Sequence, residues 1–124
     1  MSQTKSNFNE NARKVLERRY LKTDAEGKVI ETPEQMFRRV ARAIAAVDKI
    51  HDRKADIRKI EEEFYSVMTS LEFLPNSPTL MNAGTKMEQL AACFVLPIED
   101  SVDSIFETLK NMAMIHQSGG GVGY

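Results

Sequence analysis

Residues 73–124 decide the fold of this chain: FLPNSPTLMNAG (73–84), then QLAACFVLPIEDSVDSIFETLKNMAMIH (89–116), then QSGGGVGY (117–124). The apolar run at 91–96 is too short for a helix and is closed by Pro97, which predicts a buried strand. Asp100 and Ser101 precede a helical stripe that ends at Gly119. The final glycine-rich run predicts the start of a second strand, so the segment is typical of a βαβ unit.

Three amphipathic helices are predicted before this segment. The first starts near Asn7 to Asn9 and ends by Lys22. The second starts at Thr32-Pro33-Glu34-Gln35, which has the pattern of a capping box with proline at the first helical position. The third follows the polar stretch 51–56. Their apolar stripes can cover one another in a small helical layer. The stripe positions are Ala12, Val15, Leu16, Tyr20, Met36, Phe37, Val40, Ala41, Ile44, Val47, Ile57, Ile60, Phe64, Val67, Met68 and Leu71.

Between the helical layer and the strand, Ser77-Pro78 and Asn82-Ala83-Gly84 predict a loop. We therefore divide the chain into a helical region at 1–75 and the start of an α/β region at 76–124. Because the second strand is only begun, we expect the strand at 91–96 to lack a partner strand in this chain. Its backbone groups would then be unpaired on both edges.

The composition limits the classes of function. Seventeen Lys and Arg against eighteen Asp and Glu give a net charge of −1, so no global basic field would draw the chain to nucleic acid. No apolar run approaches the roughly 20 residues that span a bilayer, and the N-terminus lacks the apolar core of a signal peptide. A single cysteine, Cys93, suits the reducing cytoplasm. His51 and His116 lack spaced partners for a metal site.

The motifs NSPTLMNAG, ACFVLP and SGGGVGY resemble the start of the catalytic domain of ribonucleotide reductase, most closely the adenosylcobalamin-dependent class. Residues 9–48 are similar to the helical region that precedes the barrel in that family. The resemblance implies a mainly α N-terminal layer followed by the first strand and helix of a ten-stranded α/β barrel. Since family members are several times longer, the chain resembles a truncated, N-terminal fragment, which we expect to be inactive by itself.

The resemblance also implies roles for individual residues. Cys93, on the first barrel strand, would be redox-active: with a second cysteine much farther along the chain it reduces the ribose 2′ position, and the two end as a disulfide. Ser77, the backbone of Ala92 and Cys93, and Gly120 and Gly121 would contact the ribonucleotide substrate. Taken without the resemblance, Cys93 is a packed small side chain, Ser77 belongs to a turn or a helix start, and the glycines form a helix end with a flexible connection.

Asp100 and Ser101 match positions at the allosteric site, where a deoxynucleotide effector lies near the start of the following helix. On spacing alone they are a helix cap. The intact family member would generate its radical with adenosylcobalamin, bound outside this fragment, and would need the remainder of the reductase chain. It would also need a thioredoxin-like or dithiol reductant, and it would act as a homodimer.

Two alternatives remain open at this stage. One is the reductase class that draws its radical from an iron-containing partner subunit, which these residues do not exclude. The other is a non-enzymatic helical interaction module, in which Cys93 and the glycines are structural. That module would fold alone around a closed core.

Overall fold

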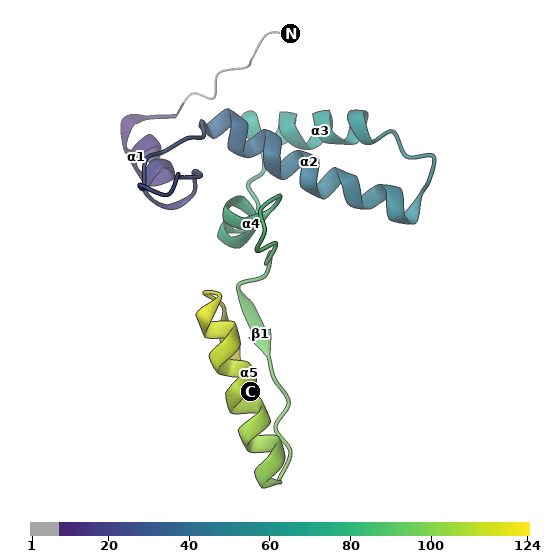
Figure 1. Ribbon diagram of the computed structural model, residues 1–124. Coiled ribbons are helices and arrows are strands. Elements are labelled where there is room, and N and C mark those ends of the chain that lie inside the picture. The colour runs from purple at the N-terminus through teal and green to yellow at the C-terminus, as the bar shows by residue number, and fades with distance from the viewer. Residues whose placement is uncertain (1–7) are drawn as a thin grey trace.

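The structure, a computed structural model, describes residues 8–124, so Asn7, one of the predicted cap positions, lies outside them. Figure 1 shows three parts along the chain: a helical layer, a short helix beneath it, and a strand-helix-strand unit that extends away from both. The elements are α1 (Glu10–Arg19), α2 (Pro33–His51), α3 (Ile57–Thr69), α4 (Ser77–Asn82), β1 (Cys93–Val95), α5 (Val102–Gln117) and β2 (Gly121–Gly123).

The helix starts follow the local sequence signals. Asn9 caps α1 through its side-chain oxygen, which accepts a hydrogen bond from the Ala12 amide at 2.8 Å. At α2 the predicted capping box is confirmed: the Gln35 amide donates to the Thr32 hydroxyl at 3.2 Å, and the Thr32 amide donates to the Gln35 side chain at 2.8 Å. Asp56 caps α3 in the same manner. Each cap satisfies amides that the helix leaves free.

The buried core lies in the helical layer, where α2 packs along α3. Phe37, Met36 and Val40 are its largest fully buried side chains. Two residues of the first stripe, Leu16 in α1 and Tyr20 at its C-cap, pack against this core. The core cluster comprises Leu21, Met36, Phe37, Val40, Ala41, Met68, Leu80 and Ala83. The prediction that three stripes cover one another is therefore confirmed for most of their positions.

Three predicted stripe positions, Val15, Val47 and Leu71, are exposed instead. On α2 the contact line runs through Ala41 and Ala45, which is fully buried, so Val47 lies to one side of it. Leu71 comes after the end of α3 at a φ of 62°, where the chain has left the helical path. For Val15 the structure shows no comparable cause.

Arg38 connects the exposed flanks of α2 and α3. Its guanidinium donates to the Glu62 carboxylate at 2.7 Å and lies 3.7 Å from the centre of the Tyr65 ring. The hydrogen bond to Glu62 is the main cause that raises the pKa of Arg38. Because these groups are partly exposed, the contribution to stability is modest.

The predicted loop at 77–84 is wrong for its first six residues, which form α4. Asn76 caps this helix, with its side-chain oxygen 3.0 Å from the Thr79 amide. Pro78 lies in the first turn, where a missing amide hydrogen costs nothing. Leu80 and Ala83 are buried against the core, so packing on α2 stabilises α4 in addition to the Asn76 cap.

The βαβ prediction is confirmed, whereas the expectation of a strand without a partner is wrong. β1 pairs with β2 in parallel, with Cys93 opposite Gly121, Phe94 opposite Val122 and Val95 opposite Gly123. Three residues of the second strand are enough to form the ladder.

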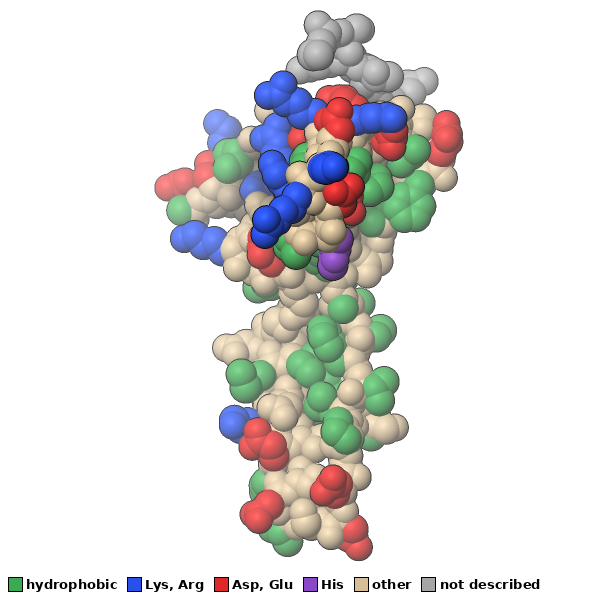
Figure 2. Space-filling model, turned by 90° about the vertical axis from the view of Figure 1, so that its right-hand side faces the viewer, with side chains coloured by type: hydrophobic (Ala, Val, Ile, Leu, Met, Phe, Trp, Pro, Cys, Tyr) green, Lys and Arg blue, Asp and Glu red, His purple; other side chains and the backbone are tan. Residues whose placement is uncertain are grey.

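The expectation that this strand is buried is also wrong, because α5 covers a single face of it. Cys93 is exposed, and Val95 is 83% exposed. The outer stripe of α5, with Ile105, Phe106 and Leu109, is exposed as well. Figure 2 shows charged side chains gathered over the helical layer and hydrophobic ones along the strand-helix-strand unit. Within residues 8–124, no helix has both the length and the apolar character to cross a membrane.

Candidate functional site

Pairing of the two strands brings Cys93 beside the glycine run. The Gly121 amide donates to the Ala92 carbonyl at 2.7 Å, and the Leu96 amide donates to the Gly123 carbonyl at 3.0 Å. Backbone groups alternate in direction along a strand, so the N–H and C=O of Cys93 point away from β2. That edge of β1 is covered by no strand in the part of the chain the structure describes.

The Cys93 side chain lies on the face of β1 opposite to α5. Phe94, its neighbour, points toward α5, because its ring lies beside Gly120 and Ile115. Side chains alternate between the two faces of a strand, so Cys93 shares the outer face with Val95. Its thiol is free and exposed. The structure thus presents both the thiol and the backbone of Cys93 on open surface.

The two predicted substrate glycines differ in what requires them. A Cβ on Gly120 would lie 2.6 Å from the Ile115 side chain and 2.9 Å from the Phe94 ring. A Cβ on Gly121 would meet only the Ala92 carbonyl, at 3.6 Å, which is an ordinary contact. Packing within the chain therefore demands glycine at 120, whereas the space beside Gly121 is open.

Alanine substitutions at these two glycines are expected to show which of them is required for packing within the chain. Gly120→Ala should destabilise the strand-helix-strand unit by about 1–3 kcal/mol, because the added methyl group overlaps Ile115 and Phe94. Gly121→Ala should change stability by less than about 1 kcal/mol. Thermal unfolding of the two variants against the parent checks this. Equal destabilisation by both would show that Gly121 is also held by packing.

Ser77 lies at the first position of α4, where its hydroxyl is 2.9 Å from the Tyr20 hydroxyl. The same helix holds the chain just before β1: the Asn76 side-chain amide donates to the Leu90 carbonyl at 3.0 Å, and the Thr79 hydroxyl donates to it at 3.3 Å. Ser77 is therefore connected to the strand of Cys93 by two hydrogen bonds rather than by proximity in sequence.

Asp100 and Ser101 lie at the opposite end of α5 from the glycine run. The Ser101 hydroxyl accepts from the Ser104 amide at 3.2 Å, and the Ser104 hydroxyl accepts from the Glu99 amide at 3.0 Å. Ser101 is thus the N-cap, as the spacing predicts, while Asp100 is exposed beside it. A helix of 16 residues is about 24 Å long, so these two residues are remote from Cys93.

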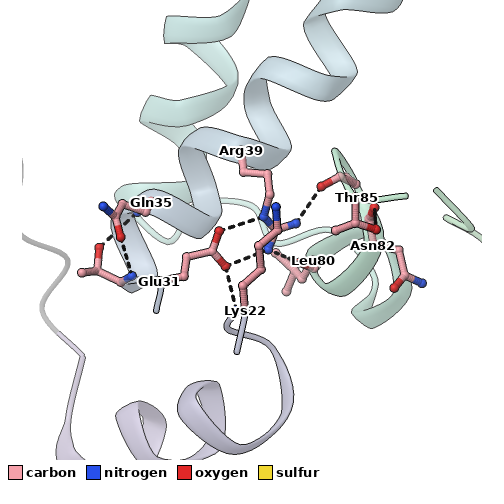
Figure 3. Close-up of polar contacts among 9 residues, drawn as sticks. Lys22, Glu31, Gln35, Arg39, Leu80, Asn82 and Thr85 are labelled. Atoms are coloured by element: carbon pink, nitrogen blue, oxygen red, sulfur yellow. Dashed lines mark hydrogen bonds and ion pairs between the residues drawn. The ribbon is translucent and has the colours of Figure 1, made fainter. Parts of the chain in front are cut away.

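One buried pair was not predicted from the sequence. Arg39 donates from Nε and Nη2 to the two Glu31 carboxylate oxygens at 2.8 and 2.9 Å, and both side chains are less than a tenth exposed. Figure 3 shows the same guanidinium reaching the end of α4, where it donates to the carbonyls of Leu80 and Ala83. The one signal of this pair in the sequence was a charged residue, Arg39, among the apolar stripe positions of the second predicted helix.

The described residues hold no cluster of three or more Cys, His, Asp or Glu side chains that could bind a metal ion. An apolar groove of about 240 Å³ lies between α2 and α3, lined by Val40, Ile44, Phe64 and Met68 among others. That volume is below the range of sites for drug-sized ligands. Cys93 is not among the residues that line this groove.

Two family models match consecutive parts of the chain. "Ribonucleotide reductase, all-alpha domain" matches residues 6–88, and "Ribonucleotide reductase, barrel domain" matches residues 91–124. The first match alone covers more than half of the chain.

Curated relatives agree with these matches. The chain is similar to the vitamin B12-dependent ribonucleoside-diphosphate reductase of Thermoplasma acidophilum, with 44% identity over 92% of this chain and 22% of that protein. The enzyme of the same name from Mycobacterium tuberculosis is 47% identical over 89% of this chain and 16% of its own length. The large subunit of the Trypanosoma brucei brucei reductase is 40% identical over 89% of the chain and 13% of its length. The chain spans about a fifth or less of the length of these relatives.

Proposed function

This chain belongs to the ribonucleotide reductase large-subunit family, and we propose on that basis that it forms part of the site where a complete reductase converts ribonucleotides to deoxyribonucleotides. The observation that supports this most strongly is the exposed Cys93 thiol, which lies on the outer face of β1 at the residue that pairs with Gly121. A thiol that reduces a substrate must be reachable, and so must the backbone that holds the substrate beside it.

In this proposal Cys93 supplies half of the reducing power. The 2′ hydroxyl leaves the ribose as water and a hydrogen replaces it, while Cys93 and a second cysteine outside this chain each give up one hydrogen. Their sulfurs then form a disulfide, which an external dithiol or a thioredoxin-like protein reduces. The second cysteine must come within disulfide distance, which an exposed thiol on an open face permits.

The substrate would lie over Ser77, the Ala92–Cys93 backbone and Gly121. The Ser77 hydroxyl can donate to an oxygen of the substrate while it accepts from Tyr20. The amides of both glycines are used within the chain, but Gly120 is buried whereas Gly121 is exposed. We therefore assign Gly120 a place beside the substrate through backbone shape and assign the close approach to Gly121.

Asp100 and Ser101 are proposed to meet a deoxynucleotide effector at the start of α5, about one helix length from the reaction. Free amides at a helix start favour an anion, and the exposed Asp100 carboxylate would repel phosphate but accept hydrogen bonds from the sugar. We also propose that the intact reductase is a homodimer and works in the cytoplasm.

For the radical source we propose adenosylcobalamin in the intact enzyme, since two of the relatives named above are vitamin B12-dependent. Residues 8–124 do not fit such a group by themselves. His51 and His116 are exposed without a side-chain partner among the described residues, and the apolar groove of about 240 Å³ is far smaller than a corrinoid. We derive no step from the cofactor. A second candidate is an iron-containing radical subunit, which relatives named without vitamin B12 favour.

A chimera tests the proposal. In the Thermoplasma relative, the segment that matches this chain is replaced by residues 1–124, and the purified protein is given ribonucleoside diphosphate, adenosylcobalamin and a dithiol. Because the aligned parts are 44% identical, we expect deoxyribonucleotide to form within about tenfold of the parent rate. A folded chimera that binds substrate and forms no product would contradict the proposal.

A further inference from the structure

The Arg39 guanidinium joins two parts of the molecule that are distant in sequence. On one side it binds the Glu31 carboxylate at two points. On the other it donates to the Ala83 carbonyl at 2.6 Å and to the Leu80 carbonyl at 3.2 Å. The last carbonyls of a helix have no partners within the helix, and its C-terminal end favours a cation. Arg39 therefore caps α4 from α2.

The position of Arg39 is itself fixed by its surroundings. Glu31 also accepts the Lys22 amide at 3.1 Å, which ties the carboxylate to the chain after α1. A Cβ on Gly84, which has a φ of 68°, would lie 3.1 Å from Arg39 Cγ. The turn that follows α4 thus packs against the stem of the Arg39 side chain. Both side chains are therefore held at more than one point.

The other polar groups of α4 hold the chain that leads into β1. Asn76 and Thr79 donate to the Leu90 carbonyl, and the Asn82 side-chain amide donates to the Gln89 carbonyl at 2.8 Å. These carbonyls precede Cys93 by only a few residues. Figure 1 shows α4 lying between the helical layer and the strand-helix-strand unit. A helix of six residues is not stable alone, so its position depends on what holds its ends.

We propose that the buried Glu31–Arg39 pair is a positioning element for Cys93: it fixes α4, and α4 fixes both Ser77 and the start of β1. The proposal rests on the redox role assigned to Cys93 for its functional consequence. The physical part, that Arg39 restrains Cys93 through α4, is independent of catalysis. Arg39 touches neither substrate nor thiol and acts only through these hydrogen bonds.

A double variant separates positioning from stability. Arg39→Met alone leaves the buried Glu31 carboxylate with the Lys22 amide but without a cation, which destabilises the layer whatever its role. Glu31→Gln combined with Arg39→Met removes both charges, so unfolding should occur near the parent temperature. The Leu80 and Ala83 carbonyls nevertheless lose their donor. Arg42→Met is the matched control, since Arg42 is on the same helix with its side chain 71% exposed.

The readout uses Cys93 itself. Because the chain has one cysteine, a nitroxide reagent labels that position alone, and its electron paramagnetic resonance spectrum reports local motion. In the double variant we expect a faster component that the parent and Arg42→Met lack. In the chimeric reductase, unlabelled, the same variant should lose about 10- to 100-fold in kcat with KM within about twofold, as expected for a misplaced reacting group.

A parental spectrum from a folded double variant would overturn the proposal. If the double variant does not fold, Arg39→Lys decides instead, because lysine leaves Glu31 a cation but cannot span both the carboxylate and the carbonyls. A changed spectrum with unchanged kcat would show that the pair restrains Cys93 but that this restraint does not affect catalysis. Loss of kcat in Arg42→Met as well would show a general effect of surface charge.

Discussion

Cys93→Ser in the chimeric reductase is expected to abolish sustained turnover, with a loss of at least about 1,000-fold. Serine can neither give up a hydrogen atom as readily as a thiol nor form a disulfide, so the proposed two-thiol reduction stops at its first step. The resemblance to the family implies that radical generation uses a third cysteine outside this chain, so it should continue. The measurements are deoxyribonucleotide formed per enzyme over many turnovers and, separately, the cofactor radical signal.

The control for this variant is stability. Cys93 is exposed and serine is nearly the same size, so unfolding should change by less than about 0.5 kcal/mol. Alanine at Val95, the exposed neighbour on the same face, should leave turnover within about threefold of the parent. Steady turnover by Cys93→Ser would return this thiol to a structural role.

The parts of the fold that were predicted correctly depend on neighbours in sequence. The capping box at Thr32 and the apolar stripe of α2 are local patterns, and both are present. The βαβ order also follows from a short apolar run, a long stripe and a glycine run. α4 was missed because Asn76-Ser77-Pro78 is equally typical of turns. Its helical state depends on Leu80 and Ala83 finding the core, which no local pattern records.

In the candidate site, too, features that depend on local sequence could be predicted, and features that depend on packing could not. Cys93, Ser77 and the glycines lie in motifs and could be selected from the sequence, although their proposed roles stay predictions. Their exposure could not be predicted, because it depends on which face of β1 α5 covers. The Glu31–Arg39 pair could not be predicted either, because its contacts also depend on packing. Arg39 meets the carbonyls of Leu80 and Ala83 more than forty positions later, and that contact exists only once α2 and α4 have packed.

Limited proteolysis of the 124-residue chain is expected to remove the whole strand-helix-strand unit while the helical layer survives. Every residue of the buried hydrophobic core cluster lies between Leu21 and Ala83. In the described part of the chain beyond residue 84, the buried residues are Thr108 and Gly120. Brief treatment with subtilisin should therefore cut first within residues 85–92, and mass spectrometry should find a resistant fragment that ends near Gly84.

This cut would also decide where the two regions divide. A division at residue 75 stays a prediction and implies early cleavage at 73–76. Burial of Leu80 and Ala83, 7% and 1% exposed, together with the Arg39 contacts, favours a fragment that keeps α4. Arg39→Met should move the first cut toward 73–76, because α4 then loses the donor at its C-terminal end.

Hydrogen exchange tests whether the β1–β2 ladder is weakly protected, as the proteolysis prediction implies. The β1–β2 ladder is three residues long and open on both outer edges among the described residues, so its amides should exchange at least about 100-fold faster than those in the middle of α2. If amides 92–95 were instead among the slowest in a monomer, the strand would belong to a closed core. The interaction module would then be the better account of the chain. Slow exchange in a dimer would have another cause, because a second copy could pair with the open edge of β1.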